Sequence, residues 1–240
     1  MQPNLDSLRI KIFGDGADLK SMVELYRNPR IKGFTTNPTL MRKDGVTDYQ
    51  SFAKQVLATI PDRPISFEVL SDDLDDMERQ ARLIASWGEN ANVKIPITNT
   101  KRVSTAPLIR RLAVDGIKVN VTGMTTLDQV SVAGEALAAG NAYSIVSVFG
   151  GRIADTGRDP VPMMAEAVKR LKAHPQIELL WASPRELLNI FQADAVGCQI
   201  ITVTGDILKK LALVGKDLDQ YSQETVQMFR DDAVKAGYVL

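Results

Sequence analysis

Short apolar runs alternate with longer amphipathic segments from one end of the chain to the other. The apolar runs are rich in β-branched residues, which is typical of buried strands. Strands are therefore expected at 9–13, 31–35, 65–70, 92–95, 117–121, 143–147, 177–181 and 200–203. Apolar residues at helical spacing predict helices at 17–27, 49–60, 73–87, 102–114, 126–139, 161–172, 184–196 and 206–213. A further amphipathic helix is expected at 219–235.

Eight strand–helix units in a chain of 240 residues match the size of a closed (β/α)8 TIM barrel. An open, doubly wound sheet is the alternative, because spacing alone does not prove that a sheet closes. A Gly-x-Gly-x-x-Gly motif does not follow the first predicted strand, which weakens the dinucleotide-binding version of that alternative. We expect an α/β fold in which 1–240 form one barrel domain, with 219–235 as a C-terminal helical extension.

Polar residues occur at the carboxyl ends of seven of the eight predicted strands. In a parallel barrel these ends, and the loops after them, carry the active site. The candidate residues are Asp15, Thr35, Asn37, Glu68, Lys94, Asn120, Thr122, Ser147, Phe149, Arg152, Ser183 and Arg185. Their recurrence at one end of the predicted barrel indicates a catalytic site there.

The alternation within the strands places several of these groups on the inner face. Lys94 shares a strand face with Asn92, opposite Val93 and Ile95, and Glu68 likewise opposes an apolar face. A lysine buried in this way must find a partner or lose its proton. A neutral amine is a nucleophile suited to carbonyl substrates. By the same alternation, Lys118, Asn120 and Thr122 are expected to point inward from the fifth strand.

Each candidate also has a structural interpretation. Lys94 could be an edge-strand lysine that reaches water, or it could form a structural ion pair with Glu68. Asp15 could cap a turn, and Asn37 with Pro38 could form an ordinary one.

The two arginines could be surface residues. However, Gly150-Gly151-Arg152 and Ser183-Pro184-Arg185 offer backbone, hydroxyl and guanidinium donors suited to an anion.

Composition excludes several other functions. Lys+Arg and Asp+Glu each number 29, so charge gives no reason to expect nucleic acid or an anionic membrane as a partner. One histidine and one cysteine, Cys198, predict no His/Cys metal site and no Ser-His-Asp triad. We expect no cofactor. The first nine residues lack the apolar core of a signal peptide, so a cytoplasmic protein is expected.

Taken together, the motifs resemble the transaldolase family, particularly its short bacterial members related to fructose-6-phosphate aldolase. The resemblance runs from Ile10 to about Leu213. The segments that carry it are Phe13-Gly14-Asp15-Gly16-Ala17-Asp18, Gly33-Phe34-Thr35-Thr36-Asn37-Pro38-Thr39-Leu40, Val93-Lys94-Ile95-Pro96, Asn120-Val121-Thr122, Ser147-Val148-Phe149-Gly150-Gly151-Arg152 and Ala182-Ser183-Pro184-Arg185. The chain departs from the family pattern at Gly16, Val148 and Pro184.

The resemblance implies a barrel in which Lys94 forms a Schiff base with a ketose phosphate. It implies that Asp15 is the acid/base of C–C cleavage, and that Glu68 and Thr122 shuttle protons through a bound water. Asn37 and Asn120 are expected to hold the dihydroxyacetone unit, supported by Thr35 and Ser147. Arg152, Ser183 and Arg185 are expected to bind the phosphate, and Phe149 to line the substrate site.

Two reactions compete within the family: transfer of dihydroxyacetone to an aldose phosphate, or its release as the free ketone. The direct aldolases tend to carry glutamine at the position of Glu68 and tyrosine at that of Phe149, so this chain resembles the transaldolases. The resemblance also implies a homo-oligomer, which in short members is often a decamer with the C-terminal helix packed on a neighbour.

Overall fold

Eight parallel strands close into a barrel in the computed structural model, which describes residues 4–239. The strands follow one another around the barrel in chain order, and β1 pairs with β8. Their bounds are β1 Lys11–Asp15, β2 Ile31–Thr35, β3 Ile65–Glu68, β4 Ala91–Pro96, β5 Val119–Met124, β6 Ser144–Val148, β7 Ile177–Trp181 and β8 Ile200–Thr204. The expectation of a closed (β/α)8 barrel is confirmed, and the open sheet is wrong.

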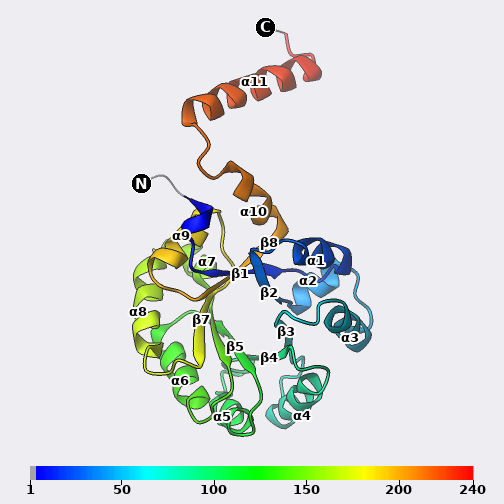
Figure 1. Ribbon diagram of the computed structural model, residues 1–240, viewed down its shortest axis with the longest axis vertical. Coiled ribbons are helices and arrows are strands. Elements are labelled where there is room, and N and C mark those ends of the chain that lie inside the picture. Colours follow the sequence, from blue (N-terminus) through cyan, green and yellow to red (C-terminus); the bar gives the residue numbers. More distant parts are fainter. Residues whose placement is uncertain (1–3, 240) are drawn as a thin grey trace.

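Helices surround the barrel, except for the last one, which projects away from it (Figure 1). They are α1 Leu19–Tyr26, α2 Pro38–Lys43, α3 Tyr49–Thr59, α4 Leu74–Ala85, α5 Ala106–Val114, α6 Leu127–Leu137, α7 Gly150–Ala154, α8 Val161–Leu171, α9 Leu188–Ala195, α10 Gly205–Lys209 and α11 Leu218–Ala236. Short 3-10 turns cover Leu5–Ser7 and Lys210–Leu213. Side chains cap several helix starts; for example, Thr126 and Gln129 form a reciprocal capping box at α6.

Two apolar clusters stabilise the barrel. The larger one lies between the strands and the surrounding helices and includes Val93 and Ile95 of β4. The smaller one consists of Phe13, Ile145, Leu180, Ala182 and Ile200. In the β1–β2 pairing Phe13 is the partner of Gly33, where an added Cβ would lie 2.6 Å from the Phe13 ring. Glycine on β2 is therefore needed for the ring to pack here.

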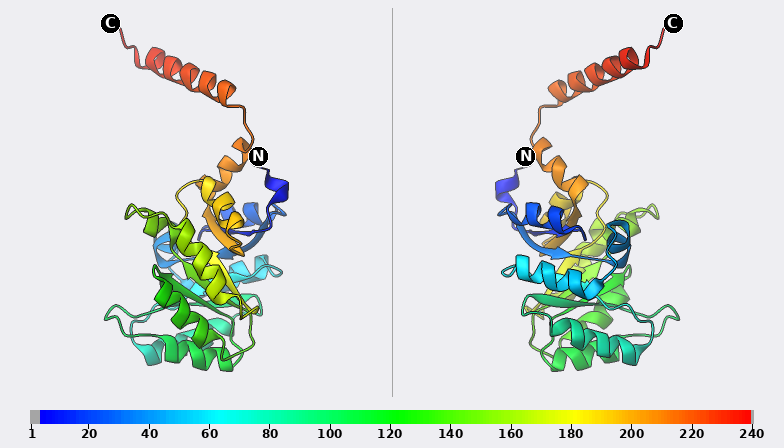
Figure 2. Two further views of the ribbon diagram at one scale, coloured as in Figure 1. Left: turned by 90° about the vertical axis from the view of Figure 1, so that its left-hand side faces the viewer. Right: turned by 90° about the vertical axis from the view of Figure 1, so that its right-hand side faces the viewer.

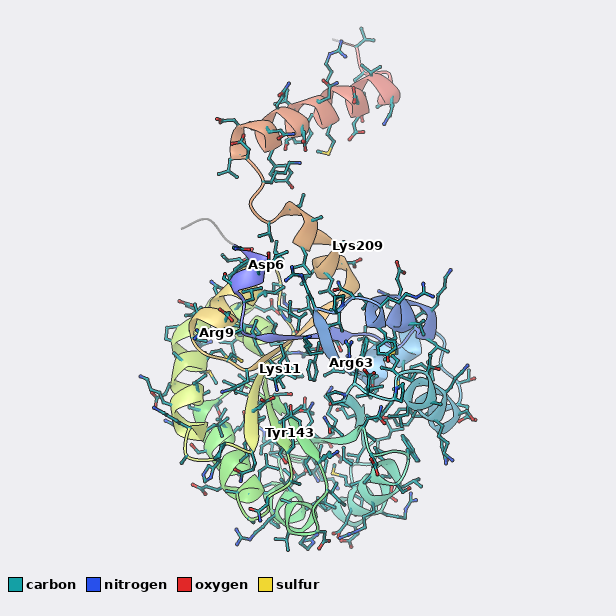
Figure 3. All side chains as sticks on the ribbon, viewed as in Figure 1. Asp6, Arg9, Lys11, Arg63, Tyr143 and Lys209 are labelled. Atoms are coloured by element: carbon teal, nitrogen blue, oxygen red, sulfur yellow. The ribbon has the colours of Figure 1, made fainter. Side chains whose placement is uncertain are left out.

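Polar residues close the amino-terminal end of the barrel. The Lys11 ammonium contacts both carboxylate oxygens of Glu178 at 2.6 and 2.7 Å, and the Tyr143 hydroxyl donates to Glu178 at 2.7 Å. Figure 3 shows Lys11 and Tyr143 at this end, near the centre of the ring of strands. This network lies at the end of a barrel that usually serves stability. Cys198 is buried, and burial raises the pKa of its thiol to about 12.

Several predicted element bounds need correction. The first strand is β1, Lys11–Asp15, two residues later than expected, so Asp15 is its last residue and does not lie beyond its end. Two short helices, α2 and α7, lie where loops were expected. Helix α9 begins four residues after the predicted start, because residues 184–187 form an irregular segment after β7.

Candidate active site

A cavity of about 450 Å³ opens at the carboxyl end of the strands. Eleven of the twelve candidate residues line it: Asp15, Thr35, Asn37, Glu68, Lys94, Thr122, Ser147, Phe149, Arg152, Ser183 and Arg185. They come from loops and strands far apart in the sequence. The structure thus brings nearly all of the sequence-predicted residues to one pocket.

Lys94 is only 6% exposed. Its ammonium donates to the Thr36 carbonyl at 3.0 Å and lies 3.1 Å from Glu68 Oε2. Glu68 and Lys94 are direct neighbours in the pairing of β3 with β4. The side chain of Lys94 is therefore buried and paired and does not reach water from a strand edge. This ion pair alone fits both a structural and a catalytic interpretation.

Two contacts hold the segment around Glu68. The Tyr49 hydroxyl donates to the Glu68 carbonyl at 2.8 Å. The Tyr49 ring packs edge-to-face with those of Phe67 and Trp87. The end of β3 is thus braced from the helix side, which fixes where the Glu68 carboxylate enters the pocket.

Asp15 lies at the end of β1 and accepts a hydrogen bond from Thr35 Oγ1 at 2.8 Å. Burial raises the pKa of the Asp15 carboxyl, although the Lys94 charge and the Thr35 hydrogen bond act in the opposite direction. A buried carboxyl with a raised pKa beside a cation is a candidate proton acceptor.

The oxygen and the nitrogen of the Asn37 side-chain amide have different roles. Its Oδ1 accepts the Leu40 N–H at 2.9 Å as the N-cap of α2, with Pro38 in the first turn. The side chain also lines the cavity, so its amide N–H groups are available to a ligand. The turn interpretation and the binding interpretation of Asn37 are therefore compatible.

Asn120 is the candidate that does not line the cavity. It is fully buried, donates to Ser66 Oγ at 3.0 Å and accepts from Ser147 Oγ at 2.6 Å. Asn120 lies on β5 beside Lys94 of β4, whereas Ser66 lies on β3 beside Asn92 of β4. The Asn120–Ser66 hydrogen bond therefore crosses β4 on the inside of the barrel, between Asn92 and Lys94. Asn120 thus lies beneath the cavity and supports Ser147, which lines it.

The inward position expected for Lys118 at this site is wrong. Lys118 precedes β5, is exposed, and donates to the Glu89 carbonyl at 2.7 Å. It lies at the amino-terminal end of the strand, where even an inward-facing residue is remote from the pocket.

The eighth strand contributes residues that sequence reasoning missed. Thr202 and Thr204 line the cavity, and the hydroxyls of Thr202 and Thr35 are hydrogen-bonded. The alternation in Ile200-Ile201-Thr202-Val203-Thr204 contained the signal, since both threonines fall on one strand face. Threonine is also a common strand residue, so this pattern alone does not distinguish a site residue from an ordinary strand residue.

The far side of the cavity carries the arginines. Arg152 lies over the Phe149 ring, with its guanidinium carbon 5.3 Å from the ring centroid. Arg185 is paired with Asp155 and donates from Nη1 to Ser183 Oγ at 3.1 Å. Both arginines are partly exposed, and both line the pocket. Two guanidinium groups and a hydroxyl on one wall are suited to an anion.

Comparisons with known proteins agree with this arrangement. Residues 12–239 match the model of the family described as "Transaldolase/Fructose-6-phosphate aldolase". The chain belongs to this family. It is 32% identical over 203 residues to a "Probable transaldolase" of Dehalococcoides mccartyi, covering 84% of this chain and 90% of that protein. A "Probable transaldolase" of a Thermoanaerobacter strain is 32% identical over 229 residues, covering 95% of this chain and 99% of that protein. Membership supports an enzyme of the aldolase/transaldolase type.

More distant solved structures share the fold. A 3-hexulose-6-phosphate synthase superposes with a TM-score of 0.58 at 17% identity, covering 84% of this chain and 92% of that chain. A putative lyase/mutase from Burkholderia cenocepacia superposes with a TM-score of 0.59 at 16% identity, covering 93% of this chain and 84% of that one. Within residues 4–239, no cluster of acidic, histidine or cysteine side chains is suited to a metal ion. The described part of the chain also lacks a helix long and apolar enough to cross a membrane.

Proposed function

We propose that this family member is a transaldolase that transfers a dihydroxyacetone unit from a ketose phosphate to an aldose phosphate through a Schiff base on Lys94. The donor is a sugar such as fructose 6-phosphate or sedoheptulose 7-phosphate. The observation that carries the proposal is a nearly buried lysine on the pocket wall, paired with Glu68 and electrostatically coupled to Asp15. A pocket that merely bound sugar phosphates has no need of these three groups together.

The first half of the reaction forms the imine. Glu68 accepts a proton from Lys94, and the neutral amine attacks the donor ketone. The hydroxyl of Thr122 has no protein hydrogen-bond partner within residues 4–239, so it is available to hold a water molecule. That water, shared with Glu68, carries the protons that carbinolamine formation and dehydration require.

The second half breaks and remakes the carbon–carbon bond. Asp15 takes the proton of the hydroxyl next to the scissile bond, the bond electrons flow into the protonated imine, and an aldose phosphate leaves. The raised pKa of Asp15 suits it to hold this proton. The dihydroxyacetone that remains on Lys94 then adds to an acceptor aldehyde, and the steps run in reverse.

The substrate groups have candidate partners in the same pocket. Asn37, Thr35 and Ser147 would contact the ketose hydroxyls, with Asn120 supporting Ser147 from below. Arg152, Ser183 and Arg185 would bind the phosphate, and Phe149 would line the pocket between the two ends. This chemistry needs no cofactor.

Borohydride trapping tests the mechanism. Reduction in the presence of fructose 6-phosphate should attach a reduced three-carbon unit to Lys94, as read by peptide mass spectrometry. Lys94→Ala should give no adduct and lower turnover by at least about a thousandfold. An adduct on another lysine would contradict the assignment.

The alternative function is a lyase that releases free dihydroxyacetone by the same imine chemistry. Glu68 and Phe149 favour the transferase. Turnover of fructose 6-phosphate with and without erythrose 4-phosphate separates the two: a transaldolase requires the acceptor, whereas turnover that ignores it indicates the lyase.

We further propose that the active protein is a cytoplasmic homo-oligomer in which α11 packs on a neighbouring copy, with a decamer as the form that the family resemblance implies. The helix projects from the barrel and contributes no buried residue (Figure 2). Leu218, Val226 and Phe229 on it are 78%, 64% and 63% exposed. Most of the stability of a helix in a protein comes from packing of its apolar face, so exposed apolar side chains on a projecting helix favour a partner.

A further inference from the structure

Arg185 is held by a residue outside the candidate set. Its Nε donates to Asp155 Oδ1 at 2.9 Å, its Nη2 donates to Asp155 Oδ2, and its Nη1 donates to Ser183 Oγ. Asp155 immediately follows α7, whereas Arg185 belongs to the segment after β7. This two-pronged contact therefore joins two loops at the pocket mouth.

Asp155 also faces the second arginine of the pocket. Arg152 lies in α7 and Asp155 is the C-cap residue three positions later, which places the two on the same side of this turn. Hydrogen bonds from Arg185 lower the pKa of Asp155, and the charges of Arg185 and Arg152 lower it further. The carboxylate is thus ionised at neutral pH and balances two cations that would otherwise repel each other.

The backbones of the two loops are fixed against each other without Asp155. A Cβ on Gly151 would lie 1.5 Å from the Ser183 carbonyl oxygen, and Ser183 itself has φ 59°. The Arg185 side chain is different, because 47% of it is exposed. Its orientation depends on Asp155 and Ser183 rather than on packing.

The contacts with Asp155 and Ser183 leave some N–H groups of Arg185 free to bind a ligand. A guanidinium has five N–H donors. Three of them are engaged with Asp155 and Ser183 in the described part of the chain, and one hydrogen on each Nη remains. The remaining N–H group on each of the two Nη nitrogens is a charged donor suited to a phosphate oxygen.

We propose that Asp155 is a positioning residue that orients Arg185 to receive the phosphate of the substrate. This inference rests on the proposed function, in which Arg185 binds a sugar phosphate. Asp155 also repels a phosphate, but water and salt screen that repulsion at a half-exposed site. The entropy that phosphate binding must remove from an arginine without Asp155 is not reduced by this screening. We therefore expect the positioning by Asp155 to outweigh its repulsion of the phosphate.

Kinetics of Asp155→Ala test the proposal. The KM for fructose 6-phosphate should rise about three- to tenfold, while kcat changes less than about twofold. Asp155→Asn keeps the size and one acceptor, so its KM should be intermediate; it also serves if the alanine variant does not fold. Asp159→Ala is the matched control, because it removes an exposed carboxylate from the same loop. Within residues 4–239, the only hydrogen bond of that carboxylate is the one it accepts from the Val161 N–H. Its KM should not change.

Two further measurements distinguish a loss of Arg185 positioning from a general distortion of the active site. Borohydride trapping with dihydroxyacetone, which has no phosphate, should show unchanged half-saturation in Asp155→Ala. In an Arg185→Lys background, which cannot form the two-pronged contact, Asp155→Ala should alter KM by less than about twofold. An equal loss with both ligands, a lower KM, or full additivity with Arg185→Lys would each overturn the proposal.

Calorimetry of inorganic phosphate binding tests the same proposal without requiring catalytic turnover. Asp155→Ala should weaken it at least about threefold. If the wild-type protein binds phosphate but traps no ketose on Lys94, the transaldolase proposal fails while this result still supports positioning by Asp155. If Lys94 is trapped but phosphate affinity does not respond to Asp155, only the positioning proposal fails.

Discussion

Asp15 is the residue whose ionisation has the clearest consequence for stability. Its folded pKa is raised by burial, so folding favours the protonated form. Below the ordinary carboxyl pKa of 3.8 the group is protonated in both the folded and unfolded states and contributes nothing. As pH rises through the raised folded pKa, Asp15 ionises inside the protein and lowers the free energy of unfolding.

Replacing Asp15 by asparagine should therefore stabilise the protein at about pH 8 while lowering turnover by about a hundredfold or more. The advantage in free energy of unfolding should shrink as pH falls to about 4, because the wild-type carboxyl is then largely protonated. Urea denaturation of both proteins at the two pH values measures this. If the stability advantage of the asparagine variant stayed constant or grew toward low pH, burial would not be the cause of the raised pKa of Asp15.

A second residue-scale prediction concerns two buried asparagines on the inner faces of neighbouring strands. Both amide atoms of Asn92 lack a hydrogen-bond partner within the described residues, whereas Asn120 bonds to Ser66 and Ser147. Asn92→Leu should leave the free energy of unfolding unchanged or raise it by about 1 kcal/mol, because an unsatisfied group is removed. Asn120→Leu should lower it by about 2 kcal/mol. Equal losses in denaturant titrations of the two variants would refute this difference.

At the scale of elements, the join between α7 and the segment after β7 determines the shape of the pocket mouth. A Cβ at position 151 would overlap the Ser183 carbonyl, so Gly151→Ala must push the two loops apart. We expect a loss of about 2–3 kcal/mol in the free energy of unfolding and a higher KM for fructose 6-phosphate.

Gly205→Ala is the matched control for that substitution. Gly205 begins the similarly short helix α10, and an added Cβ there meets nothing within 4 Å. Its unfolding midpoint in urea should stay at the wild-type value or rise slightly. A similar loss in both variants would mean that glycine flexibility, rather than the close approach to Ser183, determines the effect.

At the scale of the whole molecule, α11 is the helix that does not pack against the barrel. Its residues Leu218, Val226 and Phe229 are exposed, and none of its side chains is buried. Phe229→Glu should dissociate the proposed oligomer in size-exclusion chromatography with light scattering, because it places a charge on the apolar face. Gln227→Glu, at an exposed position two residues from Phe229 and therefore nearly opposite it on the helix, should leave the mass unchanged. A monomeric wild-type protein at micromolar concentration would rule out this role for the helix.

The hydrophobic pattern by itself determined the eight strand–helix units, because burial against helices requires apolar runs of strand length. The bounds of β2 and β7 were predicted to the residue. Polar residues at the strand ends also predicted most of the pocket, since parallel strands bring those ends to one face. These features depend on local periodicity, which a sequence shows directly.

Tertiary structure decided what depends on contacts between distant segments. Helix α7 was unexpected because its two glycines indicate a loop until Ser183 is seen against Gly151. The position of Asn120 beneath the pocket follows from the pairing register, which spacing does not reveal. Asp155 gave no sequence signal as a site residue, because its partner lies 30 residues further along the chain. Such roles arise from closure of the barrel, which places groups side by side that no local pattern connects.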